Sequence, residues 1–242
     1  MCMESKPMGR PSYGSIAHLP GSKWSKADTG LTQGQVKILT EKCRPGDVII
    51  VTEKIDGSCM AVGKKNGAII PLTRSGYHAI TSPFKQHNEM FVNWVKQNET
   101  RFDRLLNEGE RVVGEWMVQA HGMRYSLIHE PFVAFDIMNG THRLNYVIFK
   151  ERVTIEGFVT PYLIHMGGPI SIINSLLWFG YSRHGGQGMP EGIVYRVENN
   201  GKVDFLGKYV RPDFEPGKYL LNKADFAGEQ VIYNDNYEKW IM

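Results

Sequence analysis

The chain has 242 residues, of which 42% are apolar and 22% charged, as in ordinary soluble globular proteins. Its formal net charge is +3 with Lys and Arg dispersed, which permits a polyanionic partner without requiring one. No apolar run approaches the roughly 20 residues of a membrane span, and the first residues lack the apolar core of a secretory signal. These features argue against a membrane protein or an exported one, and the length favours one large domain.

The cysteines and histidines predict neither a disulfide framework nor a zinc site. Cys2, Cys43 and Cys59 are odd in number and form no Cys-x-x-Cys pair. The 8 histidines contain no ligand-spaced pair, so we expect them on the surface or in loops. A reducing, cytoplasmic location is the simplest expectation.

Residues 47–74 predict three strands. The segments "DVIIVT" (47–52), "CMAVGKK" (59–65) and "AIIPLTR" (68–74) are rich in β-branched or apolar residues. Asn66-Gly67 separates the second from the third and is typical of a tight hairpin turn. Lys54 is expected in the connection after the first strand.

The middle of the chain predicts a helix and two more strands. Apolar residues between 84 and 107 recur near helical spacing, which indicates an amphipathic helix broken at most once. Its apolar positions are Phe84, Phe91, Trp94, Val95, Phe102, Leu105 and Leu106. Apolar runs at 111–118 and 131–138 predict strands.

The last third of the chain completes the predicted elements. Helices are expected around 145–152 and 169–179, and a final hairpin joins 191–197 to 202–210 through Asn200-Gly201. Because strands cluster and helices fall between the clusters, the sequence predicts an α+β domain built on antiparallel sheets.

Charged residues recur at the ends or in the interiors of these apolar strands. A charge in a half-buried strand is costly unless it is paired or used. Both signs occur on several strands, which predicts a charged cleft suited to a phosphate-bearing ligand with a divalent metal. The residues are Lys54, Asp56, Arg74, Glu115, Asp136, Glu191 and Lys208.

The segment "EKIDG" (53–57) resembles the Lys-x-Asp-Gly signature of the covalent nucleotidyltransferases, which include ATP-dependent DNA and RNA ligases and mRNA capping enzymes. Further segments resemble that superfamily's motifs in the same order, over roughly residues 13–214. They are "TRSG" (73–76), "GEWM" (114–117), "FVAFDI" (132–137), "EGIVYR" (191–196) and "LGKYVR" (206–211). The ordered set is far more specific than any single motif.

The RNA ligases similar to RNA ligase 2 are the best match among these branches. The stretch 114–137 resembles their central region, and "YGSIAHLPGSK" (13–23) resembles their N-terminal segment. Only about thirty residues follow Arg211, too few for the OB-fold of DNA ligases and capping enzymes. The resemblance implies a nucleotidyltransferase (ATP-grasp-like ligase catalytic) fold with helices flanking antiparallel sheets, and a single adenylyltransferase domain over 1–242 without a C-terminal OB-fold.

The resemblance implies an ATP-dependent RNA ligase with Lys54 as nucleophile. Lys54 would form a covalent lysyl-AMP, pass AMP to an RNA 5′-phosphate, and allow a 3′-OH to seal the strand. An amine with an ordinary pKa of about 10.4 must lose its proton to attack. We expect burial and the positive charges of metal, Arg74 and Lys208 to favour its neutral form, with Asp56 orienting the site and supporting metal-assisted chemistry.

Four more residues are assigned to the nucleotide by the resemblance. Glu53 is expected near the adenine, and Phe135 is expected to stack on it. Glu115 would accept hydrogen bonds from the ribose hydroxyls, and Arg74 would contact ribose or phosphate.

Metal and phosphate contacts are assigned to the last two motifs. Glu191 resembles the ligand of Mg²⁺ (or Mn²⁺), and Lys208 would neutralise the α-phosphate. Related ligases often place a second lysine two residues later, whereas this chain has Arg211 three residues later. Strand alternation puts Arg211 on the opposite face, so a phosphate contact is not expected from it. Cys59 stands where related ligases have a polar residue and is expected to be a buried strand cysteine.

Other interpretations remain open at this point. The chain could be a DNA ligase, another nucleotidyltransferase of the same fold, or a non-catalytic nucleotide- or RNA-binding protein. Taken alone, Lys54 could be a solvated turn residue and Phe135 a core aromatic, and a structural role for Asp136 is as well supported as a functional one. RNA ends are the expected partner, with no membrane and no obligate protein partner.

Overall fold

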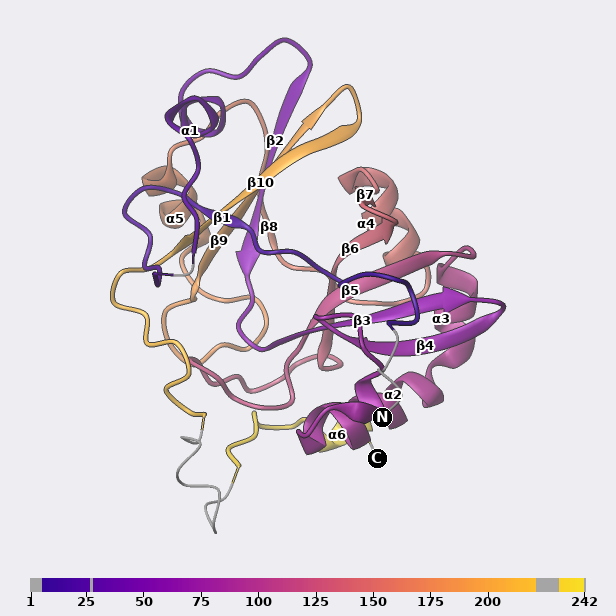
Figure 1. Ribbon diagram of the computed structural model, residues 1–242. Helices are drawn as coiled ribbons and strands as arrows, with labels where there is room; N and C mark the ends of the chain where they lie inside the picture. The colour runs from indigo at the N-terminus through magenta and orange to yellow at the C-terminus, as the bar shows by residue number, and fades with distance from the viewer. Residues whose placement is uncertain (1–5, 27, 221–230, 242) are drawn as a thin grey trace.

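The computed structural model describes residues 6–26, 28–220 and 231–241, which form two five-stranded sheets with helices packed on them (Figure 1). In the first, sheet A, the strand order is β1 (Ala17–His18), β10 (Lys202–Val210), β9 (Gly192–Asn199), β2 (Asp47–Lys54), β8 (Leu163–Gly167). In the second, sheet B, the order is β4 (Ala68–Thr73), β3 (Ser58–Lys65), β5 (Glu110–Trp116), β6 (Phe132–Asn139), β7 (His142–Arg143).

Antiparallel pairing dominates both sheets. Every pair in sheet B is antiparallel, and in sheet A only β1 pairs in parallel, with β10. Both predicted hairpins are present, because Asn66-Gly67 (φ 52° and 74°) and Asn200-Gly201 (φ 49° and 76°) adopt the left-handed backbone that tight hairpin turns require. The α+β fold class with antiparallel sheets is confirmed.

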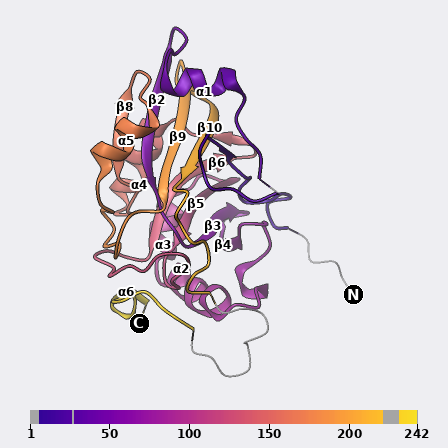
Figure 2. The same ribbon diagram turned by 90° about the vertical axis from the view of Figure 1, so that its left-hand side faces the viewer.

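Helices α1 (Gln33–Thr40) and α5 (Ile172–Phe179) cover the outer face of sheet A (Figures 1 and 2). That face and the helices share one apolar core with Leu39, Ile49, Val51, Phe179, Ile193, Tyr195 and Val197. The sequence analysis missed α1 because only a few of its residues are apolar. Its one clear signal is the capping box between Thr32 and Gln35.

The predicted helix over 84–107 is three consecutive pieces: a π-helix Gln86–Phe91, α2 (Val92–Gln97) and α3 (Glu99–Leu105). Phe91, Trp94 and Phe102 are fully or almost fully buried in the core beneath sheet B. Phe84, predicted on the same buried face, is instead 43% exposed and precedes the first helical turn. That part of the prediction is wrong.

The remaining helical elements are short, apart from α4 (Tyr146–Ile155), which follows β7 and packs on β6. They are a 3₁₀ turn at Ala79–Thr81 and α6 (Glu238–Ile241). No helix in the part of the chain described is both long and apolar enough to cross a membrane. Cys43 and Cys59 are free thiols, and Cys2 lies outside the described residues.

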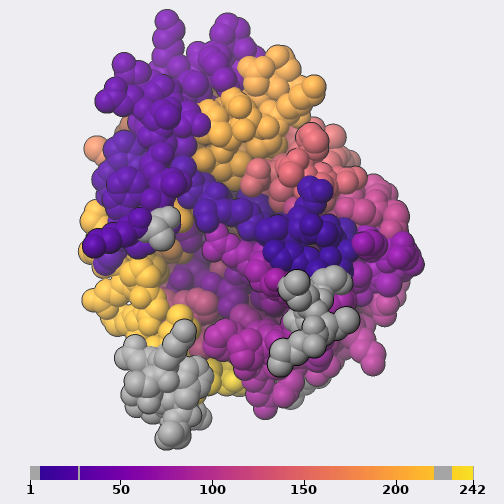
Figure 3. All heavy atoms as spheres, in the orientation of Figure 1, coloured from indigo at the N-terminus to yellow at the C-terminus, as the bar shows by residue number. Residues whose placement is uncertain are grey.

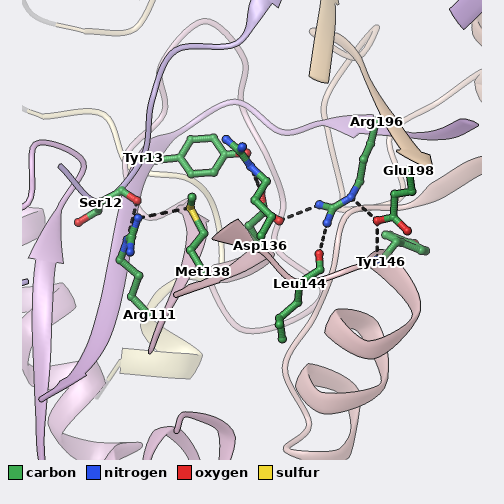
Figure 4. A network of polar contacts seen from close by, with 10 residues as sticks. Ser12, Tyr13, Arg111, Asp136, Met138, Leu144, Tyr146, Arg196 and Glu198 are labelled. Carbon is green, nitrogen blue, oxygen red and sulfur yellow. Dashed lines mark hydrogen bonds and ion pairs between the residues drawn. The ribbon is translucent and has the colours of Figure 1, made fainter. Parts of the chain in front are cut away.

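A buried ion pair joins the two sheets (Figure 4). Arg196 of β9 donates from Nη1 to Asp136 Oδ1 of β6 at 2.7 Å, although Asp136 is fully buried and Arg196 is 5% exposed. The other Asp136 oxygen accepts from the Tyr13 hydroxyl at 2.7 Å and from Arg143 Nε at 3.0 Å. Arg196 also donates from Nε to Glu198 Oε1 at 2.7 Å. These contacts give Asp136 a structural role.

Because removal of one partner leaves a buried charge uncompensated, Asp136→Ala is expected to lower the free energy of unfolding by about 3–5 kcal/mol. Urea unfolding followed by circular dichroism measures this. The control is Asp204→Ala, because Asp204 pairs with Arg44 at an exposed site and its removal should cost about 1 kcal/mol or less. Equal midpoints for the two variants would contradict the proposed role of the bridge.

Candidate functional site

A pocket of about 1090 Å³ lies between the facing sides of the two sheets. The segment from Pro11 to Ile16 contributes to its wall, and Figures 1 and 3 show this indigo segment lying across the front of the molecule. On the sheet A side, paired residues of neighbouring strands point to the same face. Thr52 of β2 pairs with Val194 of β9, and Val194 pairs with Lys208 of β10. These side chains and Lys54 therefore line one wall together.

Sheet B supplies the opposite wall. Cys59 of β3 and Glu115 of β5 are paired residues that line the pocket. In β6, Asp136 pairs with Val113 and Ala134 with Gly114, so Phe135 is the extra residue of a β-bulge. Its ring also lines the pocket, 5.0 Å edge-on to Tyr13.

Lys54 is the last residue of β2, not part of the following connection, and its Nζ donates to Glu191 Oε2 at 2.7 Å. Burial acts to lower the pKa of Lys54, but the charges of Glu191, Glu115 and Asp56 outweigh it and raise the pKa above its ordinary value. This differs from the expectation that burial, Arg74 and Lys208 would favour the neutral amine. The reason is proximity, because the nearest charge is a carboxylate in direct contact.

Two of the surrounding carboxyls are themselves strongly perturbed. Burial raises the pKa of Glu115 to about 8 and that of Glu191 to about 7, with the positive charge of Lys54 opposing both shifts. Within the described ranges no group of three or more Asp, Glu, His or Cys is placed to hold a metal ion. Glu191 fits instead as a single oxygen ligand of Mg²⁺, an ion that usually takes its other ligands from water and substrate phosphates.

Asp56 holds the backbone next to Lys54. Its Oδ2 accepts from the backbone N–H groups of Gly122 and Met123 at 2.8 and 2.9 Å, and its own N–H donates to the Tyr125 hydroxyl at 3.1 Å. Gly57 follows at a close approach, since a Cβ there would lie 2.7 Å from the Trp116 carbonyl oxygen. The Asp-Gly pair therefore orients the connection that follows Lys54.

Glu53 contributes to the pocket wall, but its carboxylate is buried and anchored elsewhere. Its Oε2 accepts from the Arg183 N–H at 3.2 Å, with His184 Nε2 at 3.7 Å. Burial raises the pKa of Glu53 to about 7, against the hydrogen bonds from Ser182 and Arg183. Its other oxygen, Oε1, is buried and has no hydrogen-bond partner among the described residues.

The three cationic residues considered in the sequence, Lys208, Arg74 and Arg211, have different surroundings. Lys208 lines the pocket, where burial and then the charge of Lys54 lower its pKa, and its Nζ lies 3.8 Å from Asp28 Oδ1. Arg74 is exposed at the pocket edge and donates to Ser15 Oγ at 3.1 Å. Arg211 does not line this pocket, as expected, but it follows the end of β10 and pairs with Asp213, so strand alternation is not the reason.

The expectation that all histidines lie on the surface or in loops is wrong for His18, which is buried in β1, whereas His184 lies in a loop but is also buried. His18 Nδ1 lies 2.6 Å from Ser22 Oγ, and His184 Nδ1 lies 2.7 Å from His129 Nε2, so neutral rings find partners in the interior. His121 lies 3.3 Å from Ser58 Oγ, and burial lowers its pKa to about 4. The His129–His184 and His121–Ser58 contacts join distant segments, so no local sequence pattern signalled them, whereas His18 and Ser22 are four residues apart.

The family model described as RNA ligase matches residues 47–210, which include β2 through β10 and the residues that surround Lys54. The chain belongs to the RNA ligase family. The expected family membership is confirmed.

Solved structures share the fold. An archaeal ATP-dependent RNA ligase, form 2, is 14% identical with a TM-score of 0.50, and the match covers 82% of this chain and 48% of that one. A Naegleria gruberi RNA ligase with PPi is 18% identical with a TM-score of 0.52, covering 80% and 58%. A mutant of that ligase with AMP and Mn is 17% identical with a TM-score of 0.51, covering 85% and 61%.

Identities this low show a shared fold only. The matches span about half to three fifths of the length of the solved ligases. A search of curated proteins finds no significant match.

The raised pKa of Glu53 predicts a pH-dependent stability. Because the folded state holds this proton more tightly than the unfolded chain, the contribution of Glu53 is fully present below pH 4.5 and is lost as the pH rises to about 7. Wild type should therefore lose about 3 kcal/mol of its free energy of unfolding between pH 4.5 and about 7, and Glu53→Gln should not show this loss. Denaturant unfolding at several pH values measures the difference. Glu99→Gln, at an exposed site on α3, is the control, and a curve for Glu53→Gln parallel to wild type would refute the assignment.

Proposed function

We propose that this protein is an ATP-dependent RNA ligase that forms a covalent lysyl-AMP on Lys54. The observation that carries the proposal is the convergence of Lys54, Glu115, Phe135, Glu191 and Lys208 on one pocket, in a chain of the RNA ligase family. Of these, Glu191 reaches the site through its contact with Lys54. We further propose that residues 1–242 act as one adenylyltransferase domain.

In the first step the Lys54 amine attacks the α-phosphorus of ATP. The new N–P bond replaces the bond to the pyrophosphate oxygen, pyrophosphate leaves, and the amine loses its proton. The ion pair with Glu191 must open for the lone pair to become available. Lys208, on the same wall of the pocket, is placed to stabilise negative charge that develops on the α-phosphate.

The walls of the pocket suit the rest of a nucleotide. Phe135 offers a ring face to the adenine from sheet B, with Val194 on the facing wall of sheet A. Glu115 is placed to accept hydrogen bonds from ribose hydroxyls, and Arg74 at the edge is placed to contact ribose or phosphate. Glu53 would act near the adenine indirectly, because its buried carboxylate anchors strand β2.

Glu191 would hold the divalent metal, with Mg²⁺ or Mn²⁺ as the fitting ion. When bound, such an ion neutralises phosphate charge and orients the leaving group. The second and third steps use the same site. A 5′-phosphate oxygen of RNA attacks the AMP phosphorus and breaks the N–P bond, and a 3′-OH then attacks the adenylated 5′-phosphate and releases AMP.

Incubation of the pure protein with α-³²P-ATP and Mg²⁺ is expected to label the protein on a denaturing gel. Lys54→Ala should abolish the label, whereas Lys202→Ala, an exposed lysine outside the pocket, should retain it. The protein is first treated with pyrophosphate to remove any bound AMP. A label that persists on Lys54→Ala would exclude Lys54 as the nucleophile. No label on wild type or on either variant would favour a non-catalytic binding protein. A separate sealing assay on matched RNA and DNA nicks distinguishes an RNA ligase from a DNA ligase.

Removal of divalent ions with EDTA is expected to stop labelling, and added Mg²⁺ or Mn²⁺ should restore it. Glu191→Gln should reduce labelling at a fixed low metal concentration by at least about tenfold, because it removes the charged ligand. Glu215→Gln, at an exposed site, is the control. A Mg²⁺ titration measures both variants, and identical curves for Glu191→Gln and wild type would contradict the metal assignment.

A further inference from the structure

The pocket extends from a buried end to an exposed rim. Tyr146 and Phe149 line it at 5% and 1% exposure, whereas Phe84 lines it at 43% exposure. Arg74 is another exposed lining residue, and Lys54 also lines the pocket. One side of the pocket, the rim, is formed by Thr81, Ser82, Pro83, Phe84 and His87, of which Thr81, Pro83 and Phe84 are exposed.

Phe84 has an exposed ring on a firmly held backbone. Its N–H donates to Ser82 Oγ at 3.3 Å, and its carbonyl accepts from the N–H groups of His87 and Asn88 at 2.9 and 3.0 Å. Asn88 Nδ2 donates in turn to the Ser82 carbonyl at 2.7 Å. An exposed aromatic with so ordered a backbone loses little entropy when a ligand covers it.

His87 supports the ring from one side. The two ring centroids are 5.5 Å apart at an interplanar angle of 79°, so the imidazole meets the phenyl ring edge to face. The His87 ring is fixed by Ser82 Oγ, 3.0 Å from its Nδ1, and burial lowers its pKa to about 4. The imidazole is therefore neutral near pH 7 and adds no charge to the rim.

The rim combines the two features that single-stranded nucleic acids require. Arg74 supplies an exposed cation for a phosphate, and Phe84 supplies an exposed aromatic surface for a base. Phe135 already provides an aromatic ring within the nucleotide pocket, which leaves Phe84 without a role toward ATP. A strand that brings its end to Lys54 must pass an exposed edge of this pocket.

We propose that Phe84 is a stacking platform for a base next to the reacting end of the RNA strand. The proposal rests on the proposed function and adds a polynucleotide-binding residue to it. It requires an aromatic ring at position 84 and not merely an apolar one, because base stacking needs a flat π surface.

The experiment measures binding of a 5′-phosphorylated single-stranded RNA by filter retention at fixed low salt, together with self-adenylation by α-³²P-ATP. The variants are Phe84→Ala, Phe84→Leu and Phe84→Tyr. Ile80→Ala is the matched control, because Ile80 is 60% exposed on the adjacent 3₁₀ turn but does not line the pocket. Thermal melting of each variant verifies that it folds.

Phe84→Ala and Phe84→Leu should weaken RNA binding by about fivefold to a hundredfold, whereas Phe84→Tyr and Ile80→Ala should bind as wild type does. Unchanged binding by Phe84→Ala, or full binding by Phe84→Leu, would overturn the stacking role. A loss of self-adenylation without a loss of RNA binding would place Phe84 in the ATP site and also overturn it. If wild type forms no lysyl-AMP, the proposed function fails, while the RNA-binding comparison still decides the role of Phe84.

Discussion

The Arg196–Asp136 ion pair is the constraint on which the geometry of the pocket depends. It joins β9 of sheet A to β6 of sheet B at 2.7 Å in a fully buried position. Val194 lies two residues before Arg196, and Phe135 lies next to Asp136, so the groups that would flank a base belong to the strands that the pair connects. Tyr13 ties the N-terminal segment to the same carboxylate. The separation of the two pocket walls is therefore set by a polar contact inside an apolar fold.

The groups around Lys54 perturb one another's pKa values. Glu191, Glu115 and Asp56 raise the pKa of Lys54, and burial raises the pKa of Glu115 and of Glu191. A ligand that brings negative charge and a metal ion would compete for the same groups. Under the proposed function, such competition would release the Lys54 amine from its ion pair only when the substrate is bound.

Local backbone features set the orientation of individual side chains that regular strand pairing alone would not determine. In a regular strand, Phe135 and Asp136 would face opposite sides of sheet B. The bulge in β6 instead turns the Phe135 side chain to the pocket side. Gly57 allows the connection after β2 to pass close to the Trp116 carbonyl, and Asp56 binds the neighbouring loop. At the rim, Ser82 and His87 hold Phe84 in an exposed position. The contacts of Asp56 and Gly57 join segments far apart in the chain, whereas those around Phe84 are local.

The sequence by itself determined the two hairpins, most strands and the order of the motifs around Lys54, because turn chemistry, strand periodicity and motif spacing are local properties. Only the tertiary structure decided the structural role of Asp136, the exposure of Phe84 and the burial of His18 and His184. It also decided the direction of the Lys54 pKa shift. Burial and charge proximity arise when distant strands meet, and no local pattern encodes which partner a buried polar group will find.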